Sequence, residues 1–363
     1  MAMTARGVIA REMNKPAQLE EFLIDPPGPG EVLVRILASG VCHTDLHVVR
    51  GLAPDGFPFL LGHEGAGVVE EVGPGVESPK VGERVMLAWR APCGRCRFCL
   101  IGQPNFCANS LNAQPRMRTT DGITLNPVLG IGTFCTHTVV AAAQAIPAPD
   151  DLSPVPLSLI GCGVMTGVGA ALYAAGVRAG SDVAVFGCGG VGMNVIQGAR
   201  LAHADKIIAV DIEPRKLAQA AQFGATHTVN PREGDPVARI KELTGGYGVN
   251  YAFEAIGRPE TLLQALMCRD LAGTCVLIGV SNKGVDLDLP MAQFFDLGGA
   301  LRVSWYGDCL PTRDFPMLAE WYRRGDLKLD ELVTERIGLG DTAEAFAKME
   351  RGETLRSVID LTQ

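Results

Sequence analysis

Two cysteines and one histidine, far apart in the chain, could bind a zinc ion together. Cys42 opens the run Cys-His-Thr-Asp, His63 lies in Gly-His-Glu, and Cys162 lies in Gly-Cys-Gly. Thiolates and imidazoles are ligands that tetrahedral zinc prefers. Three protein ligands leave a fourth position open, as a catalytic zinc does for water or substrate. A cysteine and a histidine at arbitrary spacing are more often inert core residues, so the prediction depends on the motifs around them.

Neighbouring side chains suit such an open site. Asp45 and Glu64 are carboxylates adjacent to the predicted ligands and could hydrogen-bond to them from outside the coordination sphere. Thr44 and His47 offer a hydroxyl and a base, the groups that carry a proton. We therefore predict that the segment from residue 42 to residue 64 is catalytic.

Four further cysteines predict a second zinc site. Cys93, Cys96, Cys99 and Cys107 follow the spacing C-x2-C-x2-C-x7-C, which can close a tetrahedral structural site within one short lobe, residues 90–110. Unpaired surface thiols would be an oxidation liability. An iron–sulfur cluster uses the same ligands, but the last spacing fits ferredoxin patterns poorly. A zinc ribbon for nucleic acid is disfavoured by the acidic composition.

A glycine-rich turn predicts a dinucleotide site. It follows the apolar strand expected at residues 183–186 and precedes a helical segment, residues 193–201, and it reads Gly187-Cys188-Gly189-Gly190-Val191-Gly192. In this pattern the first glycine makes the tight turn, the second lets the pyrophosphate approach the backbone, and the third allows close packing of helix on strand. The helix N-terminus attracts the phosphates.

Asp211 ends the next expected strand, nineteen residues beyond Gly192. A carboxylate at this place binds the ribose hydroxyls and repels the additional phosphate of NADP, so NAD is the predicted cofactor. A solvated aspartate at a strand end is the alternative.

Composition limits the class of protein. The chain has 363 residues, 47% hydrophobic and 20% charged, with a net charge of −8, which predicts a soluble protein of two domains. The acidic balance argues against nucleic acid or an anionic membrane as partner.

Eleven cysteines and the lack of an apolar run that could serve as a secretion signal at the N-terminus predict a reducing, cytoplasmic setting. The uncharged segment 152–177 is long enough to cross a bilayer, but its prolines and glycines favour a buried inter-domain helix.

The order of elements predicts an α/β protein. Short strands separated by Pro/Gly turns predict a compact β-rich domain over residues 1–163. Apolar strands alternating with helices predict a parallel sheet over residues 164–304. The remaining segment, 305–363, is mixed in character and is expected to return to the first domain, with helices at 314–324 and 342–351.

These motifs together resemble the zinc-dependent medium-chain alcohol dehydrogenases along nearly the whole chain. The matching landmarks are Gly40-Val41-Cys42-His43-Thr44-Asp45, Gly62-His63-Glu64, the four-cysteine lobe, Gly161-Cys162-Gly163, the glycine turn and Phe253-Glu254-Ala255-Ile256-Gly257. The resemblance implies a GroES-like β-rich catalytic domain and a Rossmann domain with a doubly wound parallel sheet. It also implies NAD, two zinc ions per chain, a small alcohol, aldehyde or thiol adduct as substrate, and a dimer or tetramer.

The same resemblance assigns roles to individual residues. It implies that Cys42, His63 and Cys162 hold the catalytic zinc and that Glu64 is a transient ligand. A proton leaves through Thr44, a cofactor ribose hydroxyl and His47. The positions expected to contact cofactor or substrate are His43 (pyrophosphate), Lys216 (ribose), Arg356 (phosphate) and Trp89 (substrate pocket).

Within this family the chain resembles the mycothiol-dependent formaldehyde dehydrogenases, whose members also reduce the nitrosylated thiol. Three segments carry this likeness: residues 88–94, 129–134 and 304–310. It implies oxidation of the mycothiol adduct of formaldehyde to a formyl thioester. Three alternatives remain at this stage: a zinc dehydrogenase of simple primary or aromatic alcohols that needs no thiol, a zinc-free NAD(P)H reductase of the same fold, and a non-enzymatic zinc-lobe binding module.

Overall fold

The computed structural model describes residues 1–281 and 284–362, which form two compact units. One unit is Met1–Cys162 with Leu310–Gln363, and the other is Gly163–Cys309. Sequence patterns suggested a second boundary near residue 304. The structure keeps residues 305–309 with the second unit because the turn at Tyr306–Asp308 packs on helix α4 (Gly163–Gly169). A Cβ atom at Gly169 would lie 2.3 Å from the Gly307 carbonyl oxygen.

The first unit is built on two β-sheets. Its larger sheet has the order β10-β6-β5-β3-β18-β17, with β9 also paired to β3. The central strand β3 (Glu31–Gly40) is buried along nearly its whole length, as a strand covered on both faces requires. The other strands of this sheet are β5 (Gly65–Val72), β6 (Arg84–Leu87), β9 (His137–Ala141), β10 (Ala145–Pro147), β17 (Val333–Ile337) and β18 (Arg356–Asp360).

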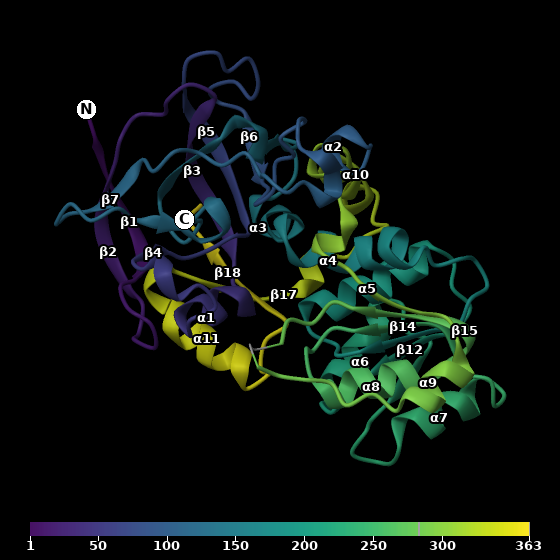
Figure 1. The fold of residues 1–363 in the computed structure, drawn as a ribbon. Helices are drawn as coiled ribbons and strands as arrows, with labels where there is room; N and C mark the ends of the chain where they lie inside the picture. The colour runs from purple at the N-terminus through teal and green to yellow at the C-terminus, as the bar shows by residue number, and fades with distance from the viewer. Residues whose placement is uncertain (282–283, 363) are drawn as a thin grey trace. The chain divides into compact units, whose positions relative to one another are not determined.

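The smaller sheet has the order β7-β2-β1-β4-β8. Its strands are β1 (Met3–Ala10), β2 (Gln18–Ile24), β4 (Phe59–Leu60), β7 (Met117–Thr119) and β8 (Asn126–Pro127). Side chains from both sheets, including Phe22, Val34 and Leu60, form one apolar core. The helices of this unit are α1 (His43–Val49), α2 (Arg97–Leu100), α3 (Pro154–Ser158), α10 (Pro311–Arg323) and α11 (Thr342–Glu350). Helices α1 and α11 lie side by side (Figure 1).

The last strand of the chain completes the larger sheet. β18 pairs antiparallel with β3, with Val358 opposite Gly40 and Ile359 opposite Ser39. This register brings the start of β18, at Arg356, to the end of β3 from which the chain runs on to Cys42. The pairing therefore carries a residue from the far end of the sequence to the segment in which the candidate zinc ligands begin.

The second unit is a doubly wound parallel sheet, which confirms the predicted fold class. The strand order is β13-β12-β11-β14-β15-β16, and each neighbouring pair is parallel. Numbered along the unit, this is the Rossmann order 3-2-1-4-5-6. The strands are β11 (Val183–Phe186), β12 (Ile207–Val210), β13 (His227–Val229), β14 (Val249–Glu254), β15 (Arg269–Leu277) and β16 (Ala300–Val303).

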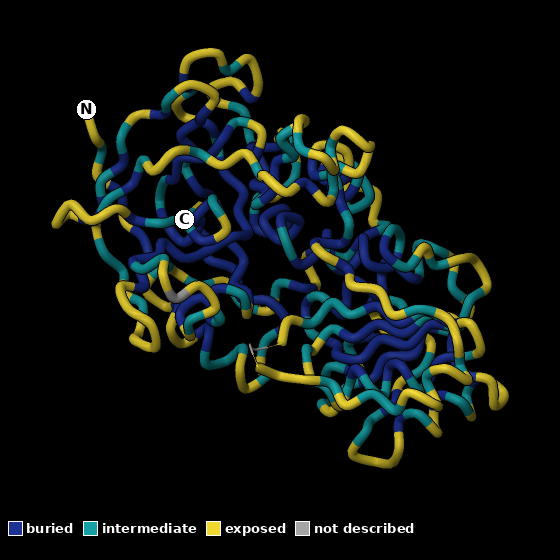
Figure 2. The backbone as a smooth tube through the Cα atoms, in the orientation of Figure 1, coloured by how far each residue is buried: buried dark blue, intermediate teal, exposed yellow. Residues whose placement is uncertain are grey.

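Helices cover both faces of this sheet. Figure 1 shows α4 and α5 on one side and α7, α8 and α9 on the other. The strands between them are buried (Figure 2), which explains their continuous apolar sequences. The helix bounds are α4 (Gly163–Gly169), α5 (Gly190–Leu201), α6 (Pro214–Phe223), α7 (Pro236–Leu243), α8 (Pro259–Met267) and α9 (Met291–Leu297).

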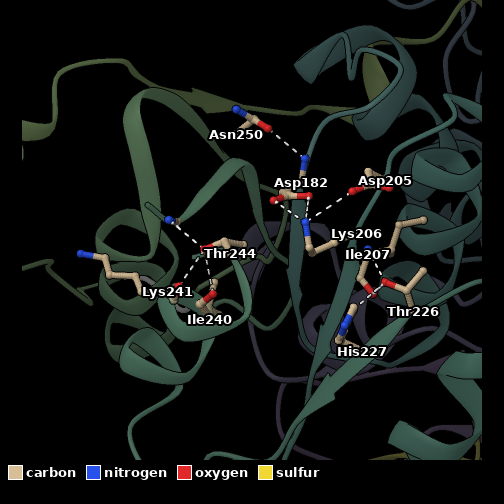
Figure 3. A network of polar contacts seen from close by, with 11 residues as sticks. Asp182, Asp205, Lys206, Ile207, Thr226, His227, Ile240, Lys241, Thr244 and Asn250 are labelled. Atoms are coloured by element: carbon tan, nitrogen blue, oxygen red, sulfur yellow. Dashed lines mark hydrogen bonds and ion pairs between the residues drawn. The ribbon is translucent and has the colours of Figure 1, made fainter. Parts of the chain in front are cut away.

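Polar side chains tie together the amino-terminal edge of the sheet (Figure 3). The Lys206 ammonium group lies 3.2 Å from a carboxylate oxygen of Asp182 and 3.4 Å from one of Asp205. The Asn250 side chain accepts a hydrogen bond from the Asp182 N–H at 2.9 Å. These contacts join the starts of β11, β12 and β14, whereas the carboxyl ends of the strands carry the glycine turn.

One sequence prediction for the uncharged segment was wrong. Residues 152–177 are buried as expected but do not form one helix: α3, a 3-10 turn, α4 and the π-helix Ala170–Ala175 follow one another. The helix breaks at Cys162, whose φ and ψ are −146° and −77°. No single helix among the described residues could span a bilayer by length and composition; the pair Pro154–Gly161 and Gly163–Ala175, bent by 56°, passes that test only together.

Candidate active site

Four residues of the first unit converge as a possible metal centre. The ligand atoms of Cys42, His63, Glu64 and Cys162 all lie within 4.8 Å of one another. In a tetrahedral zinc site, sulfur and nitrogen ligands are about 3.3–3.8 Å apart, given metal–ligand bonds of 2.0–2.3 Å. His63 and Glu64 are fully buried, and Cys42 is 8% exposed. The three ligands predicted from sequence are therefore brought together, and Glu64 joins them.

The backbone conformation at or next to each candidate ligand positions its side chain. Cys42 is the extended residue at the N-cap of α1, so its side chain precedes the helix. His63 follows Gly62, whose φ is 93° and where a Cβ atom would lie 2.4 Å from the Phe134 N–H nitrogen. Only glycine fits that turn without moving backbone. Cys162 occupies the helix break described above, which separates it from both neighbouring helices.

Asp45 contacts the ring nitrogen of His63 that faces away from the other candidate metal ligands. Its Oδ1 lies 3.1 Å from His63 Nδ1 and also accepts the Gly62 N–H at 2.8 Å. Both side chains have no solvent exposure. The contact expected from the sequence is present, and it leaves Nε2 as the nitrogen available to a metal. Burial opposes the charged imidazole, but Asp45 and Cys42 outweigh it and raise the pKa of His63.

The groups around Cys42 favour ionisation of its thiol. A hydrogen bond with Cys162 lowers the pKa of Cys42 well below its ordinary value, burial opposes this, and His63 and Arg356 reinforce it. The same hydrogen bond raises the pKa of Cys162. Thr44 Oγ1 lies 3.9 Å from Cys42 Sγ, which places the hydroxyl beside the metal ligands.

Arg356 pairs with Glu64 inside the protein. Its Nη2 forms an ion pair with Glu64 Oε1, and the Arg356 side chain is 6% exposed. Burial by itself raises the pKa of Glu64, and the net value is about 7. The sequence pointed to Arg356 as a contact for a cofactor phosphate, and in the structure its guanidinium already binds a carboxylate. This pairing was not predicted.

The residues present fit a zinc ion. His63 Nε2 and Glu64 Oε2 are buried nitrogen and oxygen atoms with no hydrogen-bond partner in the part of the chain that the structure describes. Buried polar atoms without partners are rare in folded proteins, and a bound ion is one explanation. Two sulfurs, one imidazole and a nearby carboxylate are the donor set of a catalytic zinc rather than of magnesium or calcium.

The four cysteines of the lobe also converge. Cys93, Cys96, Cys99 and Cys107 have their sulfurs within 4.8 Å of one another, with Cys96 Sγ 3.6 Å from Cys99 Sγ and 3.8 Å from Cys107 Sγ. Hydrogen bonds from two backbone N–H groups lower the pKa of Cys96 to about 6. Arg90 donates to the Cys107 carbonyl and holds the end of the lobe. Four thiols in this arrangement fit a closed zinc site.

The glycine turn lies at the carboxyl end of β11. Gly187 has a φ of 94°, and its N–H donates to the Val210 carbonyl at 2.8 Å. A Cβ atom at Gly192 would lie 1.7 Å from the Gly187 carbonyl oxygen, so that position tolerates only glycine. At Gly189 a Cβ atom would meet no described atom within 4 Å, which leaves room for a ligand. Helix α5 begins at Gly190, inside the motif and three residues before the predicted start.

Asp211 follows β12 beside this turn. Its Oδ2 accepts the Cys188 N–H at 2.8 Å, and its Oδ1 accepts the Glu213 N–H at 2.9 Å. Each carboxylate oxygen keeps a further lone pair that a ribose hydroxyl could use. The aspartate is therefore held in a fixed orientation by the backbone.

Known proteins share this architecture. The family model described as zinc-binding dehydrogenase matches residues 190–324, and that of the alcohol dehydrogenase GroES-like domain matches residues 28–150. An S-(hydroxymethyl)glutathione dehydrogenase from Synechocystis sp. is 39% identical over 98% of this chain and all of the relative. The chain belongs to the zinc-binding alcohol dehydrogenase family. The protein is accordingly an oxidoreductase.

Two solved structures of this dehydrogenase family have the same fold. An alcohol dehydrogenase zinc-binding domain protein from Burkholderia ambifaria matches with a TM-score of 0.94 at 36% identity, covering 100% of both chains. Benzyl alcohol dehydrogenase from Acinetobacter calcoaceticus matches with a TM-score of 0.92 at 30% identity, covering 99% of both chains. These likenesses confirm the predicted α/β fold with its GroES-like and Rossmann-type parts.

The remaining residues singled out in the dehydrogenase sequence lie in different settings. His43 and His47 are on α1, with His43 exposed, His47 half-buried and their ring centroids 6.4 Å apart. Lys216 is half-buried in the first turn of α6. Trp89 packs against the core of the first unit. Their roles toward cofactor and substrate stay predictions.

Sequence reasoning missed two supports of the candidate metal site. One is the Glu64–Arg356 ion pair, which joins residues 292 positions apart. The other is the hydrogen bond of 2.6 Å between the buried hydroxyls of Ser39 and Thr133, which joins β3 to the segment beside Gly62. No local sequence signal marks either pair, because each joins residues that are far apart in the chain.

Proposed function

We propose that this enzyme oxidises the hemithioacetal formed by a low-molecular-weight thiol and formaldehyde, using NAD. The convergence of Cys42, His63 and Cys162, with His63 Nε2 buried and without a hydrogen-bond partner among the described residues, carries the proposal. The relative from Synechocystis named for an S-(hydroxymethyl) thiol adduct supports this substrate class. The reaction converts RS–CH2OH and NAD⁺ into RS–CHO, NADH and a proton.

The residues of the chain have distinct parts in this reaction. When bound, zinc polarises the substrate oxygen and lowers the pKa of the hydroxyl, and NAD accepts the hydride. Thr44 accepts the proton of the substrate hydroxyl as it gives up its own, and His47, one turn further along the same face of α1, is the base that releases a proton to solvent. Asp45 fixes the ring of His63 so that Nε2 faces the metal.

We propose NAD rather than NADP because of Asp211. The carboxylate stands at the end of β12 and is held by two backbone N–H groups, so it cannot turn away from a ribose phosphate without losing both bonds. Replacing it in Asp211→Gly should lower the ratio of kcat/KM for NAD over NADP. An unchanged ratio would mean that another residue reads the ribose.

The finer proposal is that the thiol is mycothiol. Residues 88–94, 129–134 and 304–310 support it, and the reduction of the nitrosylated thiol would use the same site. Glutathione is the competing thiol, because it appears in the names of relatives such as the Synechocystis enzyme. A dehydrogenase of simple or aromatic alcohols is the second candidate, supported by the similarity to a benzyl alcohol dehydrogenase. A zinc-free reductase is disfavoured, because the convergence of Cys42, His63 and Cys162 would then have no function.

The deciding assay measures NADH formation from formaldehyde with mycothiol, with glutathione and with neither, beside a panel of primary and aromatic alcohols. We expect turnover that requires mycothiol. Equal rates with either thiol would reduce the proposal to a general thiol adduct, and activity on alcohols alone would refute it. Cys42→Ala should abolish turnover and leave NAD affinity intact.

We also propose a homodimer formed through β16. This strand is the terminal strand of its sheet in the described chain, and Leu301 and Val303 on it are 39% and 63% exposed. An exposed apolar edge strand is a template for pairing with another copy. Arg302 does not block it, because its Nη1 donates to the Ala174 carbonyl within the same unit. Sedimentation of the parent and of Val303→Lys tests this, and an unchanged mass would contradict it.

A further inference from the structure

Glu254 is a buried carboxylate that takes no part in the proposed reaction. It ends strand β14, within residues 253–257, a landmark of the family resemblance to which no role has been given. The residue has no solvent exposure. No lysine or arginine side chain in the part of the chain that the structure describes pairs with it, so hydrogen bonds hold its charge. A buried charge is costly unless it is paired or hydrogen-bonded, so those donors must stay in place.

The donors belong to the loop and the helix that follow β14. Oε1 of Glu254 accepts the Ile256 N–H and the Gly257 N–H at 2.9 Å each and the Thr261 hydroxyl at 2.8 Å. Oε2 accepts the Gly257 N–H at 3.0 Å. Thr261 lies in the first turn of α8. Hydrogen bonds to a charged acceptor are stronger than those between neutral groups, so the carboxylate fixes the path of the chain from β14 into α8.

The same carboxylate lies where this loop meets the loop after β15. A Cβ atom at Gly279 would lie 2.1 Å from the Gly257 nitrogen and 2.7 Å from Glu254 Oε2. A Cβ atom at Gly257, whose φ is 88°, would lie 2.7 Å from the Val280 carbonyl oxygen. The Ser281 hydroxyl donates to the Gly257 carbonyl at 2.7 Å. The two loops are therefore packed backbone against backbone, with Glu254 at their contact.

These loops lie where a doubly wound sheet binds its ligand. The strand order reverses between β11 and β14, and the carboxyl ends of those two strands flank the crevice. The glycine turn follows β11, and the loop held by Glu254 follows β14. The two are in contact, since a Cβ atom at Gly187 would lie 2.6 Å from Ile256 Cγ1, and Ile256 is 42% exposed. The glycine turn and this loop therefore form two sides of one crevice.

We propose that Glu254 is a positioning residue for the dinucleotide, because it holds the loop at residues 255–257 as the second wall of the crevice beside the glycine turn. This inference rests on the NAD site of the proposed function. Without the carboxylate, the N–H groups of Ile256 and Gly257 turn to other acceptors, and the loop leaves the position that fits the cofactor. Binding must then restore that position, and the affinity for NAD and NADH falls by the fraction of molecules that still have it.

The test is a fluorescence titration of the purified zinc-loaded enzyme with NADH, without substrate. Glu254→Gln keeps the shape of the side chain but replaces one acceptor oxygen by an NH2 group that faces N–H donors. We expect the Kd for NADH to rise about tenfold, as it does when the binding-competent population falls to about a tenth. Equal Kd values in Glu254→Gln and the parent would overturn the proposal.

Asp182→Asn is the matched control for a general loss of stability. Asp182 is a carboxylate at the amino-terminal edge of the same sheet (Figure 3), and it pairs with Lys206 at 3.2 Å. Thermal unfolding should give a lower Tm for both variants, whereas NADH affinity should fall only in Glu254→Gln. Comparable losses of NADH affinity in the two variants would show a general structural effect and would refute positioning by Glu254.

Thr261 gives an independent test if Glu254→Gln does not fold. Thr261→Val keeps the shape of the side chain and removes the hydroxyl that binds Glu254 Oε1, so the Kd for NADH should rise about threefold, the effect of one hydrogen bond. Thr261→Ser keeps a hydroxyl and should bind NADH like the parent. Parent affinity in Thr261→Val would then overturn the proposal. Absence of NADH binding by the parent would instead disprove the cofactor site, so the two failures are distinguishable.

Discussion

His63 Nδ1 lies 3.1 Å from Asp45 Oδ1, and neither side chain has any solvent exposure. A carboxylate behind a metal-binding imidazole fixes the tautomer and increases the basicity of the ligand nitrogen. Asp45→Asn keeps the size of the side chain and loses the charge. We expect zinc affinity at this site to fall about 10- to 100-fold. Competition with a chromophoric chelator measures it, with exposed Asp121→Asn as the control; equal affinities would contradict the role of Asp45.

Zinc binding to the Cys42–His63–Cys162 site should depend strongly on pH. The hydrogen bond with Cys42 raises the pKa of Cys162, and Asp45 and Cys42 raise that of His63 against the effect of burial. Both groups must lose a proton to bind the metal, so protons compete with zinc up to a higher pH than for ordinary thiols and imidazoles. Affinity should rise with pH through neutrality and beyond. Proton release on zinc addition in weak buffer checks this, and release that does not change with pH would count against it.

Loss of a lobe cysteine should destabilise the protein. Cys96→Ser removes one of four converging sulfurs, so the folded state can no longer gain the free energy of closed zinc coordination. The loss should be about 4 kcal/mol when free zinc exceeds its Kd a thousandfold. Thermal unfolding with and without chelator measures it. The chelator should lower the Tm of the parent further than that of the variant, and equal shifts would refute the structural zinc.

Two glycines of the dinucleotide turn should behave differently. Gly192→Ala places a Cβ atom 1.7 Å from the Gly187 carbonyl oxygen, so the turn must distort and stability should fall by a few kcal/mol. Gly189→Ala meets no described atom within 4 Å and should fold normally while weakening NAD at least about tenfold, because the methyl group occupies the approach of the pyrophosphate. Fluorescence titration with NADH and thermal unfolding separate the two effects. Unimpaired NADH binding in Gly189→Ala would place the cofactor elsewhere.

Glu31 should contribute to stability in weak acid. It is 4% exposed and accepts hydrogen bonds of 2.7 Å each from the Gly28 N–H, the Gln114 N–H and the Arg116 guanidinium. Burial alone would raise the pKa of Glu31, but these donors outweigh it and lower the pKa below its ordinary value. Its contribution is therefore complete above the ordinary pKa of glutamate and is lost as the pH falls through the lowered value.

The change Glu31→Gln should cost about 1–3 kcal/mol near neutral pH and should flatten the acid limb of the stability curve. Urea unfolding from neutral pH down to a pH below the ordinary pKa of glutamate measures both. Glu77→Gln, at an exposed position, is the control. A difference between Glu31→Gln and the parent that stays constant with pH would show that the carboxylate charge contributes nothing.

The sequence alone determined what depends on neighbouring residues. The spacing of the lobe cysteines predicted a site whose sulfurs do converge, and the apolar strands with the turn at 187–192 predicted the parallel sheet and its order of elements. The helix predicted at residues 342–351 is observed at Thr342–Glu350. Spacing and periodicity report on these features because each is made by residues close together in the chain.

Tertiary structure decided what depends on distant pairing. The break of the uncharged helix at Cys162 was not predicted, although Gly161 and Gly163 flank it and glycine disfavours a helix. Only the tertiary structure shows that Cys162 converges at this break with Cys42 and His63. The contact of Arg356 with Glu64 exists because β18 pairs antiparallel with β3. The buried Glu64 carboxylate needs a positively charged partner, and the strand pairing supplies Arg356. No local sequence pattern could have indicated this partner, because the two residues are far apart in the chain.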